Sequence, residues 1–313
     1  MLIPSAPSMM TNKTPSMTFL LVALVSCSTD GGTADGGVDA PVDAPVADAP
    51  ADSPADAAGD GGLSAPEALD QAGKLALWLE ATPSQITLGD AGGVTAWKDK
   101  SKNKNDAVAG GPLAIVASGA VAGHDAVHFN IASASVQIAD AVSLQFGTGQ
   151  VYIVAVTRVR VPRMFWFQKF ARNDGGTVAT GIEFFDANAG ANDAGGFIFS
   201  PFGELDNQSG NSVNWGTTEL NDDKFHIVAF RRTASTSIEV AVDDLAPRTQ
   251  TVAAVDVSAT GELTYLGSPP QSPGPGTPDL YIAEELVVHD ASGLVSDKDA
   301  AAVHAYLKQK YAL

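Results

Sequence analysis

Hydrophobic and polar residues alternate with a period of two through most of the chain from Leu75 onward. The segment Leu-Ala-Leu-Trp-Leu-Glu-Ala begins there and places Leu75, Leu77 and Leu79 on one face, with Trp78 and Glu80 on the other. Such alternation is typical of a β-strand. Similar runs, bounded by Gly, Pro, Asn and Asp, predict strands at residues 94–97, 114–116, 126–130, 136–138, 151–159, 164–170, 181–185, 196–199, 225–233, 237–244, 252–257, 263–266 and 280–289.

Some of these segments carry further expectations. The run 151–159 is long, apolar and rich in β-branched residues, so we expect it at the centre of a sheet. The runs 225–233 and 237–244 are predicted to form an antiparallel pair joined by a short turn. The polar residues 98–105 are predicted to form a surface loop, because Asp, Ser and Asn side chains hydrogen-bond nearby backbone in turns.

One helix is predicted near the end of the sequence. Ser296, with Asp299 three residues later, is a capping-box-like start. A single apolar stripe follows at Ala300, Val303, Leu307 and Tyr311. Many short strands without alternating helices predict an all-β sandwich or jelly roll of two antiparallel sheets. We expect residues 74–106 and 280–290 to lie as neighbouring strands that close this domain.

The first residues form a predicted secretory leader, in which Lys13 precedes the short apolar run Phe19–Val25. Met9, Met10 or Met17 could each be the true start. The run leads into Leu-Val-Ser-Cys, which resembles a bacterial lipobox and implies cleavage before Cys27 and acylation of that residue. We therefore predict a lipoprotein signal peptide over residues 1–26 and a lipid bilayer as a partner. An ordinary leader with a chance or buried cysteine is the alternative. Cys27 is the sole cysteine, so no intrachain disulfide can form.

Residues 27–66 are predicted to be a disordered tether. Asp recurs there about every fourth residue among Ala, Pro, Gly and Val, with no aromatic residue to form a core. Calcium-binding acidic repeats are the alternative, but their Gly-rich nonapeptide pattern is missing. Lys and Arg total 18 against 36 Asp and Glu, which gives a net charge of −18. This charge argues against a nucleic-acid partner. The serine after Cys27 favours, by analogy, the outer membrane or cell surface.

Residues 67–313 resemble the laminin-G-like, concanavalin A-like jelly-roll domains of bacterial surface proteins. The resemblance lies in LALWLEA, VTAWKDKSKNKNDA and AVHFN near the start, and in IAEELVVHD and AVHAYLKQKYAL at the end. Glu80 stands where the family usually has Asp, and Ala312 where it usually has Gly. The resemblance implies a two-sheet sandwich with a concave face. It implies no single activity, because the fold includes lectins, adhesion modules, glucanases and structural domains.

No catalytic residues are assigned. Glycosidases of this fold place Glu, Asp and Glu at even spacing on one strand, so that two carboxylates flank the scissile bond. The nearest match, residues 204–209, ends in Ser rather than Glu. Glu183 and Asp186 are at odd spacing, and the pair Glu284 and Glu285 lies in the closing strand. A divergent glycoside hydrolase remains an alternative, but we expect no enzyme.

Calcium is the one cofactor that the sequence leaves open. Oxygen-bearing side chains of the kind that Ca²⁺ prefers gather in one Gly-rich region, at Asp174, Asp186, Asn188 and Asp193. A polar surface loop accounts for the same residues. The five histidines are scattered and none pair at zinc-ligand spacing, so a zinc site is not expected.

The candidate ligand site is a loop around one aromatic residue. Trp215 could stack on a sugar, and amides and a carboxylate lie near it at Asn211, Asn214 and Asp206. Trp78 and Trp97 are assigned to the core, whereas residues 165–167 are expected to turn one aromatic outward. We predict a membrane-anchored surface protein that binds carbohydrate or another cell-surface ligand without catalysis. A structural or adhesive protein with no small-molecule site is the second interpretation.

Overall fold

The computed structural model describes residues 62–160, 165–172, 178–186, 197–199, 220, 222–244, 246–252, 254, 256–268, 279–289 and 295–313. The chain divides into two units, Met1–Ala57 and Ala58–Leu313, and every described residue lies in the second. The leader, Cys27 and most of the predicted tether therefore lie outside the described residues. Among those that are described, no helix is long and apolar enough to cross a membrane.

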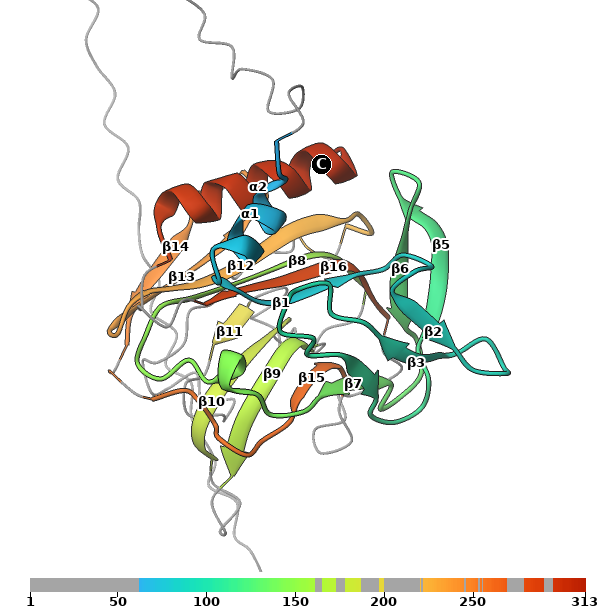
Figure 1. Ribbon diagram of the computed structural model, residues 1–313, viewed down its shortest axis with the longest axis horizontal. Helices are drawn as coiled ribbons and strands as arrows, with labels where there is room; N and C mark the ends of the chain where they lie inside the picture. Colours follow the sequence, from blue (N-terminus) through green and yellow to red (C-terminus); the bar gives the residue numbers. More distant parts are fainter. Residues whose placement is uncertain are drawn as a thin grey trace, which may run out of the picture. The chain divides into compact units, whose positions relative to one another are not determined.

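Two antiparallel sheets face each other, which confirms the predicted all-β sandwich (Figure 1). Sheet A has the order β14 (Arg248–Thr251), β13 (Ser237–Val242), β12 (His226–Ala234), β8 (Val151–Val159), β16 (Leu280–His289), β6 (His124–Phe129) and β5 (Ile115–Val121), and β1 (Leu75–Glu80) also pairs with β16. Sheet B has the order β11 (Phe197–Phe199), β10 (Val178–Asp186), β9 (Phe165–Arg172), β15 (Thr264–Gly267), β7 (Ser135–Ile138), β4 (Ala107–Ala109), β3 (Val94–Trp97) and β2 (Ile86–Leu88).

The central strands of sheet A are buried on both faces. One face packs against sheet B around the main hydrophobic core. The other is covered by the helices α1 (Ala65–Gln71) and α2 (Asp297–Tyr311), which lie above it in Figure 1. A strand with two buried faces reads as a continuous apolar run. This explains the near-unbroken apolar sequences of β8 and β16, and β8 is central in its sheet as predicted.

The two ends of the domain are neighbours, as expected, because β1 pairs antiparallel with β16. The register shifts between Leu75 and Leu77. Leu77 and Leu79 face sheet B, whereas Leu75 packs with Trp78 beneath the helices. The predicted common face of the three leucines is therefore wrong at Leu75, because a bulge moves that side chain to the other side of the strand.

The aromatic segment of β9 contains a bulge, and the outward aromatic predicted within residues 165–167 stays a prediction, because the side chain of Phe165 lies outside the described part of the structure. Trp166 and Phe167 are both fully buried in the core between the sheets. The pairing with β10 shows why, since Phe184 faces Phe167 and Phe185 faces Phe165, which leaves Trp166 as an extra residue. A bulge of this kind lets two consecutive side chains point inward. Trp78 and Trp97 are buried, as predicted.

Other predicted strands and the predicted helix are present, although some begin or end at residues other than those predicted. The pair of β12 and β13 forms as predicted. Helix α2 begins after Ser296, whose hydroxyl accepts a 3.1 Å hydrogen bond from the Asp299 N–H. The strand predicted at residues 252–257 lies instead at β14, Arg248–Thr251, an exposed strand paired with β13. The short strands β2 and β4 and the helix α1 were not predicted, and α1 begins at Ala65, ahead of the proposed boundary at residue 67.

Candidate ligand-binding cleft

The polar segment after β3 is half buried, which corrects the prediction of a plain surface loop. Asp99, Ser101 and Asn105 are buried, whereas Lys98, Lys102 and Lys104 are exposed. We call residues 98–105 the lysine loop. Its buried polar side chains, at Asp99, Ser101 and Asn105, face β1.

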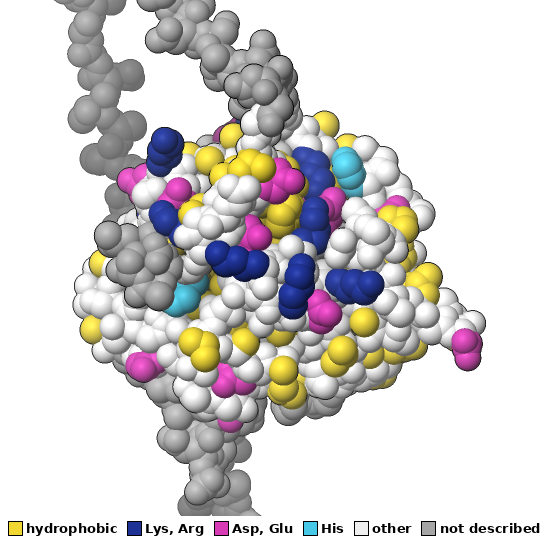
Figure 2. All heavy atoms as spheres, in the orientation of Figure 1, with side chains coloured by type: hydrophobic (Ala, Val, Ile, Leu, Met, Phe, Trp, Pro, Cys, Tyr) yellow, Lys and Arg dark blue, Asp and Glu magenta, His cyan; other side chains and the backbone are white. Residues whose placement is uncertain are grey.

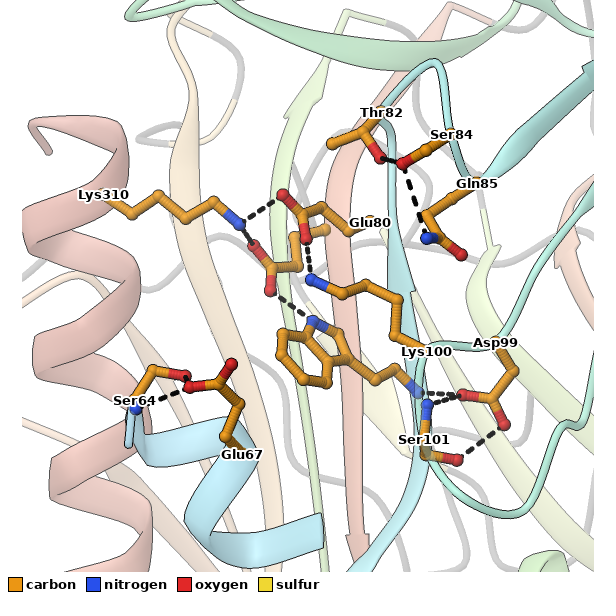
Figure 3. A network of polar contacts seen from close by, with 12 residues as sticks. Ser64, Glu67, Glu80, Thr82, Ser84, Gln85, Asp99, Lys100, Ser101 and Lys310 are labelled. Carbon is orange, nitrogen blue, oxygen red and sulfur yellow. Dashed lines mark hydrogen bonds and ion pairs between the residues drawn. The ribbon is translucent and has the colours of Figure 1, made fainter. Parts of the chain in front are cut away.

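The carboxylate of Asp99 organises the lysine loop (Figure 3). Its Oδ1 accepts from the Trp78 N–H at 2.9 Å and from the Ser101 N–H at 2.8 Å. Its Oδ2 accepts from the Ser101 hydroxyl at 2.7 Å and from the Asn105 N–H at 2.8 Å. A carboxylate with several donors is stable in a buried position. One buried acid therefore fixes the path of the whole loop.

The lysine loop also covers the free edge of β1. Asn105 donates from Nδ2 to the Ala76 carbonyl at 2.9 Å, and Asn103 donates to the Leu75 carbonyl at 2.7 Å. The Lys100 N–H donates to the Trp78 carbonyl at 2.8 Å. Covering an edge in this way satisfies backbone groups that would otherwise stay unpaired. The loop is thus a rigid wall beside the start of β1.

A cleft of about 680 Å³ opens between this wall and the turn that precedes β8. Its lining comes from Gly73 and Leu75 at the start of β1, Asn103 of the lysine loop, residues of the segment 142–149, and His289 at the end of β16. The segment includes the 3-10 helix η1 (Val142–Leu144). The cleft is larger than two other hollows of the described residues, which measure about 390 Å³ and about 280 Å³.

Neutral polar groups dominate the cleft, and the fold holds several of them in place. Ser143 accepts from Asn105 Nδ2 at 2.8 Å, and Gln145 donates to Asp140 at 3.0 Å. His289 Nδ1 lies 3.0 Å from the Gln150 carbonyl, and its ring meets Phe146 edge-on at 5.1 Å. Amides, hydroxyls and an imidazole beside apolar surface suit a small polar ligand. No lining residue is a carboxylate or an ammonium.

Two smaller hollows lie at the opposite side of β1. One of about 390 Å³ is lined by aliphatic residues of the edge strands β2 and β5, and one of about 280 Å³ lies beside Glu80, His124 and Asp125. The acid Glu80 is already paired with Lys100 and Lys310. These hollows therefore offer fewer free polar groups than the cleft.

The carboxylates nearest to a catalytic arrangement are structural. Lys310 lies between Glu80 and Glu284, at 2.8 Å and 2.6 Å (Figure 3). Glu284 also accepts from Trp78 Nε1 at 2.7 Å and from the Tyr311 hydroxyl at 2.8 Å, and it is fully buried under α2. Burial opposes ionisation of Glu80, but hydrogen bonds from Lys100 and Lys310 hold its pKa below the usual value. This network fastens α2 to sheet A.

Most residues of the predicted sites lie outside the described part of the chain. This holds for Trp215, Asn211, Asn214 and Asp206, for the calcium candidates Asp174, Asn188 and Asp193, and for Cys27. Asp186 is the last residue of β10, where it pairs with Phe197. These assignments stay predictions. Within the described ranges no group of three or more His, Cys, Asp or Glu side chains could hold a metal ion.

The sequence reasoning did not find the cleft. Its lining residues come from four separate segments and carry no motif. Two signals were present, namely the amide-bearing lysine loop and the turn Gly147-Thr148-Gly149 directly before the strongest strand. Loops held by a rigid sheet are frequent ligand sites, so both segments were candidates for a ligand site.

Comparison with known proteins supports the architecture. No family model matches the chain, and no curated protein matches it. Among solved structures, the binding domain of botulinum neurotoxin serotype D is similar, with a TM-score of 0.52 and 10% identity over 76% of this chain and 52% of that one. A structure of botulinum neurotoxin type C, whose cell entry depends on interaction with two ganglioside molecules, has a TM-score of 0.51 and 11% identity over 77% and 52%.

The chain thus spans about half the length of these solved domains. At such low identity, the similarity establishes a shared β-sandwich fold.

Proposed function

We propose that the domain binds a carbohydrate non-catalytically in the cleft beside β1. The observation that carries this proposal is an open cleft of about 680 Å³ lined by neutral hydrogen-bonding groups. Sugar hydroxyls both donate and accept, so they pair well with amides, hydroxyls and imidazole. The exposed side chain of Val142 offers contact for the apolar face of a sugar ring.

A binding role without catalysis fits the carboxylates of the described residues. Glycoside hydrolysis needs two carboxyl groups on either side of one bond. Glu284 is buried and bonded to four donors, and Glu285 is buried without a hydrogen-bond partner among the described residues. Neither lines the cleft.

Two resemblances to known proteins also support the proposal, although the proposal does not depend on them. The motifs at both ends of the domain resemble laminin-G-like domains of bacterial surface proteins, a fold that includes lectins and adhesion modules. Botulinum neurotoxin type C, which shares the sandwich, interacts with gangliosides. These likenesses make a surface glycan a reasonable ligand class to test first.

A blocking substitution tests the site. Thr148 is exposed at the rim of the cleft, so Thr148→Trp should fold normally and fill the space. On an array of surface glycans, we expect the full chain to bind and Thr148→Trp to lose at least about tenfold in affinity. The matched control is Val108→Trp, which adds the same bulk at an exposed position outside the cleft.

The outcomes separate the two candidate sites. If Trp215→Ala abolishes binding while Thr148→Trp leaves it unchanged, the ligand binds at the predicted loop and the cleft assignment is wrong. If the full chain binds no glycan with or without calcium, the carbohydrate proposal fails.

We also propose that the chain is an exported lipoprotein, anchored at the outer membrane or cell surface through Cys27. Its support is the position of the sole cysteine directly after a short apolar run. Mass spectrometry of the mature N-terminus should find an acylated Cys27, and Cys27→Ser should release the protein from membranes. An unmodified N-terminus beyond Cys27 would contradict the anchor.

A further inference from the structure

The outer side of the lysine loop carries a local excess of positive charge on an acidic protein. Lys98, Lys100, Lys102 and Lys104 alternate along it, whereas the chain as a whole has a net charge of −18. Asp99, the one acid among residues 98–105, is buried and held by Trp78, Ser101 and Asn105. Figure 2 shows a group of Lys and Arg side chains near the centre of the face below α1.

Among these four lysines, Lys100 is the one that forms an ion pair within the described structure. Lys100 pairs with Glu80 and lies 3.8 Å from the centre of the Trp78 ring. Within the described part of the chain, Lys98, Lys102 and Lys104 form no ion pair. Lys104 Nζ makes a single long contact of 3.4 Å, to the Lys100 carbonyl. Like charges close together repel one another, so this arrangement gives the fold no evident stability.

One of the unpaired lysines, Lys102, adjoins the cleft, and Lys104 lies two residues farther along the exposed side of the lysine loop. Lys102 Nζ lies 3.2 Å from the place that a Cβ on Gly73 would occupy, and Gly73 lines the cleft. Asn103, between the two lysines, lines it as well. The backbone of the loop is fixed here, since the Lys102 N–H donates to Asp70 Oδ1 at 2.9 Å. The ammonium groups therefore extend from a rigid rim.

We propose that the cleft selects acidic glycans, with a carboxylate or sulfate on the sugar bound by Lys102 and attracted by the positive charge of the neighbouring Lys104. This inference rests on the proposed carbohydrate function and specifies its ligand class. The neutral groups of the cleft hold the hydroxyls of the sugar, and the lysines at the rim hold its charge. Charge-assisted hydrogen bonds are stronger than neutral ones and weaken as salt screens them. An otherwise acidic surface repels anions elsewhere, which favours this rim as their binding place.

The test uses matched pairs of oligosaccharides that share one backbone, one neutral and the other bearing a carboxylate or a sulfate. Calorimetric titration of the full chain at low and at high salt gives the affinities. We expect the acidic member to bind about tenfold more tightly at low salt, with the advantage shrinking at high salt. The double variant Lys102→Gln/Lys104→Gln should lose this advantage and retain binding of the neutral member.

Lys224→Gln is the control, because Lys224 is exposed near the far ends of β8 and β12, away from the cleft. It removes one positive charge and should leave the preference unchanged. Equal affinity for both members, or an acid preference that survives the double variant, overturns the inference and leaves the carbohydrate proposal standing. Absence of binding to either member overturns both. Thermal unfolding of each variant checks that the fold is intact.

Discussion

Glu284 and Glu285 are adjacent in β16, but only one of the two buried carboxylates has hydrogen-bond partners among the described residues. Glu284 points toward α2 and meets donors from Trp78, Tyr306, Lys310 and Tyr311. Glu285 is fully buried, and neither of its oxygens has a hydrogen-bond partner in the described structure. Burial without a partner raises the pKa of Glu285 well above its ordinary value of 4.5. The first carboxylate fastens the helix, and the second is held in its neutral form.

The raised pKa of Glu285 predicts a pH-dependent loss of stability. Above pH 4.5 the unfolded chain releases this proton and the folded chain keeps it, so the unfolding free energy falls as pH rises toward the folded-state pKa. The loss is about 1.4 kcal/mol per pH unit over that window. Urea unfolding between acid and neutral pH should show a shallower decline for Glu285→Gln. Glu262→Gln, at an exposed carboxylate, should retain the wild-type slope.

Ala312 is strained in a position that favours glycine. It follows α2 in the left-handed region, at φ 52° and ψ 45°, where a Cβ costs about 1 kcal/mol. Ala312→Gly should therefore stabilise the domain by about 0.5–1 kcal/mol. The exposed mid-helix change Ala302→Gly should destabilise it by about 1 kcal/mol. Denaturant midpoints that move in the same direction for both variants would contradict this account.

At the scale of elements, the lysine loop acts as a substitute edge strand for β1. Asp99→Ala would leave the buried N–H groups of Trp78 and Asn105 without their acceptor. We expect a loss of about 3 kcal/mol or more in unfolding free energy, measured by urea titration. Asp90→Ala, in the exposed turn before β3, should change it by less than about 0.5 kcal/mol. Equal effects of the two changes would mean that Asp99 does not organise the loop.

The pattern of the sequence predicted elements well where burial alone decides them. The runs of β8, β12 and β13, and the stripe of α2, were identified because one period persists over many residues. The errors have local causes. The bulge between Leu75 and Leu77 shifts the alternation by one residue, and β2 and β4 are only three residues long. Residues 98–105 were misjudged because polar side chains suggest solvent, whereas several of them bond the backbone of β1. The cleft escaped prediction because only the tertiary fold assembles it.

At the scale of the whole molecule, one network joins the beginning of the domain to its end. Lys310 of α2 bridges Glu80 of β1 and Glu284 of β16. The hydroxyl of Tyr306 accepts from the same ammonium at 2.9 Å. One ammonium group therefore links the two strands and the helix that close the sandwich, in addition to the backbone pairing of β1 with β16 and the apolar packing of α2.

Removing that charge should loosen the closure. Lys310→Met keeps the aliphatic stem but leaves two buried carboxylates without their shared cation, so we expect a loss of about 3 kcal/mol at neutral pH. The loss should shrink in acid, where Glu80, whose pKa Lys310 helps to hold below its usual value, gains a proton. Lys308→Met, at an exposed pair with Asp244 on the same helix, should have a much smaller effect. A pH-independent loss for Lys310→Met would argue against the electrostatic explanation.

The central position of β16 has a consequence for the order in which the domain is made. This strand lies between β8 on one side and β1 and β6 on the other, yet it follows every other described strand of the domain in the sequence. Contacts between distant parts of a chain form late and slowly. The pairings of β16 with β1, β6 and β8 therefore cannot form until this strand has been synthesised, whereas β8, β12, β13 and β14 can pair with one another before it.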